Sequence, residues 1–142
     1  MRVTSARDSS AKTQSGNFSA GIFQVLQSRK VKAKGLTELR LKGSSFKRCA
    51  PAGRGKRRGR RSSIEAHDAA RTIRRLRGSA NGRFRTRGRN SSATVRGTVW
   101  TVTDRCDGTL TKVTRGKVAV RDFRAKKTIV LRSGKRYLAK AR

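Results

Sequence analysis

The sequence is poor in acidic residues, aromatic residues, proline, histidine and cysteine. Its 142 residues include 7 Asp and Glu but 39 Lys and Arg, so the formal net charge is +32. The single Pro excludes a proline-rich or collagen-like chain. One His and two Cys are too few to supply the full ligand set of most structural zinc sites. We therefore expect neither a metal nor a cofactor.

Long apolar runs are also absent. The longest candidate, residues 18–26, is interrupted by polar residues and glycine and falls short of the roughly 20 residues that cross a bilayer. Residues 1–15 are polar and lack the apolar stretch of a secretory signal peptide. The sequence thus predicts no transmembrane segment.

Residues suited to catalysis are sparse. The acidic residues occur singly rather than in pairs, and His67 lies in a polar stretch that favours an exposed loop. Nothing in the sequence orients a dyad of Cys106 and His67. Gly53 and Gly55 begin like a dinucleotide-binding fingerprint, but Arg58 occupies the position of its last glycine. We therefore expect a protein that is not an enzyme.

The apolar content allows only a small core. Leu, Ile, Val and Phe together number 27 residues, a share just below the roughly 20 % at which highly charged chains approach disorder. The length is that of one domain, since domains typically have about 100–200 residues. The like charges repel one another until they are screened or neutralised.

The clearest pattern is a series of short alternating strands in residues 83–142. Turn signals lie at Asp107-Gly108, Arg115-Gly116 and Ser133-Gly134 and, with an unmarked turn expected near Ala125, give a spacing of about 8–11 residues. The first of these dipeptides is typical of a two-residue hairpin turn. Gly97, inside a strand run, indicates a bulge or a close backbone approach. The pattern predicts an all-β domain of short antiparallel strands, arranged as a meander, a sandwich or a solenoid.

Composition divides the chain into three parts. Residues 1–48 contain strand-like runs, including one in which Leu39 and Leu41 share a face opposite Arg40. Residues 49–70 form a basic linker rich in Gly and Arg, and residues 71–142 contain the β core.

Residues 64–78 have two interpretations. One is a helix, with a capping-box spacing at its start. The other is a strand over 71–77 that pairs with residues 82–87 across Ser79-Ala80-Asn81, where Asn81-Gly82 is a strong turn signal. We favour the strand, with at most a short helical turn over residues 64–70.

Two cysteines raise the question of a disulfide. Cys49 and Cys106 both lie close to expected loops, and their number is even, which favours a disulfide over two free thiols. A bond between them would close a long loop, worth roughly 4 kcal/mol in the chain-entropy model. For a chain with so small a core, this is a large share of the total stability.

Clustered cations point to binding of a polyanion through counterion release. Phe84, flanked by arginines, has the sequence context of a base-stacking residue, although alternating arginines are equally typical of the solvated face of a strand. Trp100 is expected in the core. The polyanion-binding candidates are Arg54, Lys56, Arg57, Arg58, Arg60, Arg61, Arg83, Arg85 and Arg87.

The C-terminal half resembles a known family. The runs ATVRGTVWTVTD at 93–104, DGTLTKVTRGKVAV at 107–120 and TIVLRSGKRYLA at 128–139 are similar, in order and spacing, to the FecR-type domain. The residues of this motif are Val95, Arg96, Gly97, Thr98, Trp100, Asp107, Gly108, Thr109, Gly116 and Gly134.

The resemblance implies an all-β binding or structural domain of the bacterial cell envelope or exterior. The best-known members are membrane-anchored regulators of sigma factors, and this chain lacks their membrane segment and sigma-binding helices, so that role does not carry over. Such domains are exported, whereas here strand-like Arg2-Val3-Thr4 follows Met1 directly. We therefore expect a truncated or misassigned start.

Two hypotheses follow. The first is a non-enzymatic, exported FecR-like domain whose partners are anionic envelope polymers or another protein. The alternative is a cytoplasmic nucleic-acid-binding protein, similar to ribosomal proteins, that binds phosphates with residues 54–61 and 71–89.

Overall fold

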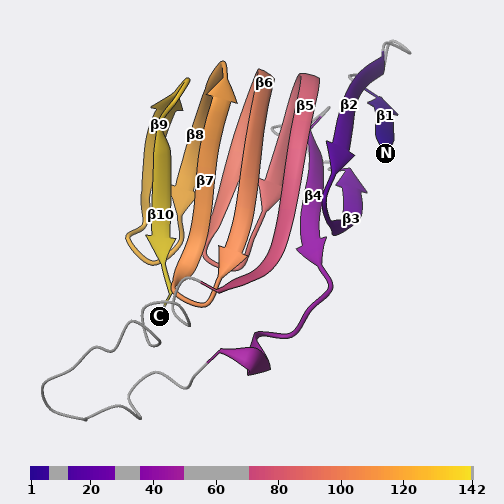
Figure 1. The fold of residues 1–142 in the computed structure, drawn as a ribbon. Coiled ribbons are helices and arrows are strands. Elements are labelled where there is room, and N and C mark those ends of the chain that lie inside the picture. Colours follow the sequence, from indigo (N-terminus) through magenta and orange to yellow (C-terminus); the bar gives the residue numbers. More distant parts are fainter. Residues whose placement is uncertain (7–12, 28–35, 50–70, 142) are drawn as a thin grey trace, which may run out of the picture.

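The computed structural model describes residues 1–6, 13–27, 36–49 and 71–141, and these form an all-β fold, as the sequence predicts (Figure 1). Among them, no helix is long and apolar enough to cross a membrane. The elements are β1 (Arg2–Ala6), β2 (Thr13–Ser19), β3 (Ile22–Gln27), β4 (Thr37–Lys42), the 3₁₀ turn η2 (Phe46–Arg48), β5 (Thr72–Arg87), β6 (Ser91–Arg105), β7 (Gly108–Arg115), β8 (Lys117–Asp122), β9 (Lys127–Arg132) and β10 (Arg136–Lys140).

The strands form one sheet organised around the two longest, β5 and β6. Figure 1 shows these in the middle, with β1–β4 on one side and β7–β10 on the other. The N-terminal part of β5 and the C-terminal part of β6 belong to the order β1-β2-β5-β6-β7-β10, the first half-sheet. Their other parts belong to the order β3-β4-β5-β6-β8-β9, the second half-sheet. Every pairing is antiparallel except β4 with β5.

The two half-sheets face each other across an aromatic core. Phe18 of β2, in the first half-sheet, lies with its ring centre 5.5 Å from that of Phe84, in the second. Trp100 stands edge-on to Phe18, and its indole N–H donates to the hydroxyl of Thr86 across the core at 3.0 Å. All three aromatic side chains are buried. Full burial of one such side chain contributes roughly 2–3 kcal/mol, and these three belong to a core that also contains Leu39, Leu76, Val113 and Val120.

The sheet bends where a hairpin turn was predicted. That prediction is wrong, because β5 continues through Asn81-Gly82 as one strand. Its register against β6 shifts between Ala80 and Arg83, so Asn81 and Gly82 face a single residue, Gly97. This is a β-bulge, which bends the strand and increases its twist. Both glycines have positive φ, 137° and 60°, and the expectation of a bulge at Gly97 is confirmed.

Two other glycines carry the chain between the half-sheets. Gly116 (φ 89°) separates β7 of the first half-sheet from β8 of the second, and Gly134 (φ 80°) precedes the return to β10. These turns therefore do not close hairpins, because the strands on either side of each belong to different half-sheets. The Gly116 N–H donates to the hydroxyl of Ser133 at 3.0 Å, which joins the two crossings.

The strand pattern of the sequence agrees with the observed burial. Leu39 and Leu41 are buried while Arg40 between them is exposed, as predicted. Of the family-like motif, Val95, Thr98, Trp100 and Thr109 are buried. The β6–β7 turn consists of Cys106 and Asp107, one residue earlier than expected, because Gly108 already pairs with Arg105.

The predicted disulfide is formed. Cys49 follows η2 and is bonded to Cys106 in the β6–β7 turn. Next to it, the ring of Phe46 lies between two guanidinium groups, 4.9 Å from that of Arg74 and 4.2 Å from that of Arg89. The bond and these contacts attach η2 to one end of the sheet. The expected linker beyond Cys49 and the expected helical turn fall in residues 50–70, outside the described residues.

A Gly78→Ala variant tests the packing of the core. A Cβ at this position would lie 2.8 Å from the Trp100 ring and 2.9 Å from that of Phe18, so we expect a loss of about 1–3 kcal/mol in thermal or urea unfolding. The neighbouring Ser79 is exposed, and Ser79→Ala serves as the control, with a change within about 0.5 kcal/mol. Equal stability of the two variants would contradict the close packing at Gly78.

Reduction of the disulfide tests its contribution to stability. We expect loss of the Cys49–Cys106 bond to lower the free energy of unfolding by roughly 4 kcal/mol, because the unfolded chain gains the entropy of an open loop. The measurement compares urea unfolding of the native protein with that of a Cys49→Ser/Cys106→Ser variant. Two titratable thiols in the denatured, unreduced protein would show that the bond is absent.

Candidate polyanion-binding face

The outer side of the second half-sheet is covered with cations. Along each strand, buried and outward-facing residues alternate, so that Phe84 and Thr86 are buried while the arginines beside them face outward. Directly opposite residues on neighbouring strands project to the same side, which brings cations from five strands onto one surface. We name this surface the basic face; its cations are Arg40, Arg83, Arg85, Arg87, Arg96, Lys117, Arg121 and Arg132.

Several of these cations directly oppose one another. Arg40 is the register partner of Arg87, Arg83 of Arg96, and Lys117 of Arg132. Like charges in directly opposed positions destabilise a sheet. Among the described residues, the outer side of the first half-sheet has one such pair, Lys112 with Arg136. Repulsion is therefore concentrated on the basic face, where a bound anion would relieve it.

A single carboxylate lies among the cations of this face. Glu38 accepts hydrogen bonds from Arg40 Nε at 2.6 Å and from Arg85 Nε at 2.7 Å. Burial by itself would raise the pKa of Glu38, but these hydrogen bonds and charges outweigh it and hold the pKa below its ordinary value. Arg40 and Arg85 are thus partly neutralised within the protein.

Arg87 has an aromatic contact. Its guanidinium lies 5.1 Å from the centre of the Phe123 ring, which is half-buried after β8. Such a contact restrains the side chain without removing its charge. Arg87 therefore presents a positioned cation at the edge of the basic face.

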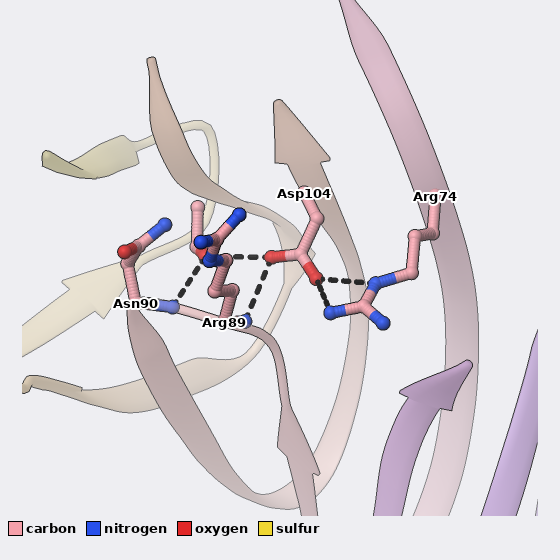
Figure 2. Close-up of polar contacts among 5 residues, drawn as sticks. Arg74, Arg89, Asn90 and Asp104 are labelled. Carbon is pink, nitrogen blue, oxygen red and sulfur yellow. Dashed lines mark hydrogen bonds and ion pairs between the residues drawn. The ribbon is translucent and has the colours of Figure 1, made fainter. Parts of the chain in front are cut away.

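Asp104 has a structural role in the fold. Figure 2 shows its carboxylate between Arg74 and the loop at residues 89–90. It accepts from the Arg74 side chain at 2.8 Å, from the Arg89 N–H at 3.0 Å and from the Thr109 hydroxyl at 2.6 Å. The Asn90 N–H in turn donates to the Thr109 hydroxyl. A fully buried carboxylate with this many donors anchors the β5–β6 turn to β7.

The other described carboxylates are occupied as well. Asp107 forms an ion pair with Arg105 across the β6–β7 turn. Asp122 accepts from the Ala125 and Arg124 N–H groups and from the Tyr137 hydroxyl. Burial would raise the pKa of Asp122, but these hydrogen bonds lower it, and the same contact with Asp122 raises the pKa of Tyr137. Of the described carboxylates, Glu38 is therefore the one that pairs with cations of the basic face.

The predicted binding residues divide into two groups. Arg83, Arg85 and Arg87 share the basic face, whereas Arg54, Lys56, Arg57, Arg58, Arg60 and Arg61 lie outside the described residues. Base stacking by Phe84 is ruled out, because its side chain is fully buried. Trp100 is in the core, as expected.

Sequence reasoning missed more than half of the cations of the basic face. Arg40, Lys117, Arg121 and Arg132 were not predicted to bind, and Arg96 was noted only for its place in the motif. Each occupies an outward position in an alternating strand, so the signal for exposure was present. Their assembly depends on β4 and β8 lying beside β5 and β6, which no local pattern reveals.

Catalytic and metal-binding groups do not gather in the described part of the chain. No cluster of three or more His, Cys, Asp or Glu occurs there. Cys106 is in the disulfide, so its thiol is not available for a dyad, and His67 lies outside the described residues.

Comparison with known proteins adds no relative. No protein-family model matches the chain, and no curated protein or solved structure matches it.

A Glu38→Gln variant tests the charge balance of the basic face. Because the pKa of Glu38 is lowered in the folded protein, its carboxylate stabilises the fold above the ordinary pKa, and this contribution is lost as the pH falls through the folded value. We expect the variant to be less stable than the native protein at pH 7 and the difference to vanish near pH 2 in urea unfolding. A matched control is Asp107→Asn, a partly exposed turn pair, which should change stability by less than about 1 kcal/mol. A difference for Glu38→Gln that persists unchanged at low pH would contradict this role.

Proposed function

We propose that this chain is a non-enzymatic, FecR-like binding or structural domain whose basic face attaches it to anionic polymers of the bacterial cell envelope or exterior. The observation that carries the proposal is the set of like-charged cross-strand pairs on one face. Folding brings these cations together at a cost in repulsion. A polymer with repeated negative charges lowers that cost and releases its own counterions on binding.

The described surface favours recognition of backbone charge over recognition of bases. Single-stranded nucleic acids are commonly bound by exposed aromatic side chains on which bases stack. In the described residues, Phe18, Phe84 and Trp100 are buried, and Phe46 and Phe123 are half-buried beside guanidinium groups. A polymer recognised only through its anionic groups therefore fits this surface better than one recognised through its bases.

The disulfide supports a site of action in an oxidising compartment. Disulfide bonds such as Cys49–Cys106 persist in compartments outside the cytosol, because cytosolic thiols are kept reduced. The resemblance of residues 93–139 to the FecR-type domain points to the same location. Cytoplasmic binding to nucleic acid is the alternative function.

Exchange of four cations for neutral residues tests the proposal. A variant with Arg87, Arg96, Arg121 and Arg132 changed to Gln removes one member of each opposed pair and one further cation of the basic face. The matched control changes Arg75, Arg77, Lys112 and Arg136, exposed cations of the first half-sheet, to Gln, and so removes the same charge. Binding to long-chain polyphosphate is measured by fluorescence anisotropy over a salt series.

We expect the basic-face variant to bind at least about tenfold more weakly at 0.15 M salt, with a shallower salt dependence, because each lost phosphate contact removes one unit of counterion release. The control should lose about threefold or less. Equal losses would show that net charge alone drives binding. Tighter binding of single-stranded RNA than of polyphosphate at equal charge would favour the nucleic-acid alternative.

A further inference from the structure

A polar cavity opens at the corner where the sheet bends. It has a volume of about 310 Å³ and is lined by Thr13, Gln14, Asn81, Gly82, Arg83, Arg96 and Gly97. The two arginines are direct register partners at the edge of the basic face. No acidic side chain of the described residues lines the cavity. Its chemistry is therefore that of hydrogen-bond donors and positive charge.

The bulge creates this cavity. Two residues of β5, Asn81 and Gly82, face only Gly97 on β6, so the pairing of the two strands is interrupted at the residues that line the cavity. A Cβ placed on Gly97 would meet no atom within 4 Å, which shows that the space in front of its backbone is open. On the other wall, a Cβ on Gly82 would lie 2.6 Å from Gln14. Glycine at position 97 thus leaves the cavity open, and glycine at position 82 allows β2 to approach β5 closely.

Gln14 holds the backbone of Arg83 in place. The Arg83 N–H donates to Gln14 Oε1 at 2.9 Å, and Gln14 Nε2 donates back to the Arg83 carbonyl at 3.2 Å. Gln14 is itself buried and also donates to the hydroxyl of Ser5. The start of the Arg83 side chain is therefore fixed by the core, as in a preorganised site.

We propose that this corner cavity binds one phosphate group, with Arg83 and Arg96 as the anion-binding residues. A guanidinium presents parallel N–H donors that match two oxygens of a phosphate, and two guanidinium groups from opposed positions match its tetrahedral shape. Thr13 and Asn81 supply a hydroxyl and an amide at the rim. The phosphate is either free or one unit of a phosphate-bearing polymer. In the second case, the site rests on the proposed function and gives the polymer a fixed point on the basic face.

Titration with inorganic phosphate tests the site without a polymer. We expect saturable shifts of the Gly82, Arg83, Arg96 and Gly97 amide signals in ¹H–¹⁵N spectra of the full chain at 0.15 M chloride. An Arg83→Gln/Arg96→Gln variant should bind phosphate at least about tenfold more weakly. The control, Arg87→Gln/Arg121→Gln, removes the same charge from the same face and should leave the affinity within about twofold.

The outcomes separate this site from the proposed function. The phosphate site would be overturned by signal shifts that are spread over the basic face, do not saturate, and change equally in the Arg83/Arg96 variant and its control. Such a result would not affect the proposed function, which is tested separately by polyphosphate binding of the variant with four cations exchanged. Equal shifts with acetate at the same ionic strength would show a general anion site and also overturn the assignment to phosphate. Saturation with a short oligophosphate but not with inorganic phosphate would show that the cavity binds a phosphate group as one unit of a polymer, in agreement with the proposal.

Discussion

The contact between Phe18, Phe84 and Trp100 is the interaction on which the rest of this structure depends. A chain with so few large apolar residues must bury them in one place, and β5 and β6 are long enough to contribute to both half-sheets. Because successive side chains of a strand point to opposite faces, packing the inner faces of the two half-sheets together leaves every second residue facing outward. The basic face is a consequence of this alternation, because Arg and Lys occupy outward positions on five strands of the second half-sheet.

The few carboxylates explain how so cationic a chain folds and why it remains cationic. Asp104 and Glu38 are buried at points where arginines converge, and Asp122 secures the turn after β8. Each therefore stabilises a specific junction between strands. Among the described residues, Glu38 is the one carboxylate that lies among the cations of the basic face, so the like charges of that face are only partly offset.

Much of the local structure could be read from the sequence, and the errors have one cause. The strands around Leu39 and from Gly108 to the C-terminus were recognised from alternation, and the cysteine pair from its number and position. Asn81-Gly82 was taken for a hairpin because its dihedral preferences fit a two-residue turn. The same preferences fit a bulge, and the register between β5 and β6 decides between them.

The amino-acid sequence by itself determined the fold class, the disulfide partners and the residues that face outward, because each of these follows from spacing along a single strand or from a simple count. The tertiary structure alone decided that β4 lies parallel to β5, that the chain crosses between half-sheets at Gly116 and Gly134, and that Arg83 faces Arg96 beside a cavity. These are relations between residues far apart in the chain, and they are set by which packing buries the aromatic cluster rather than by any local preference.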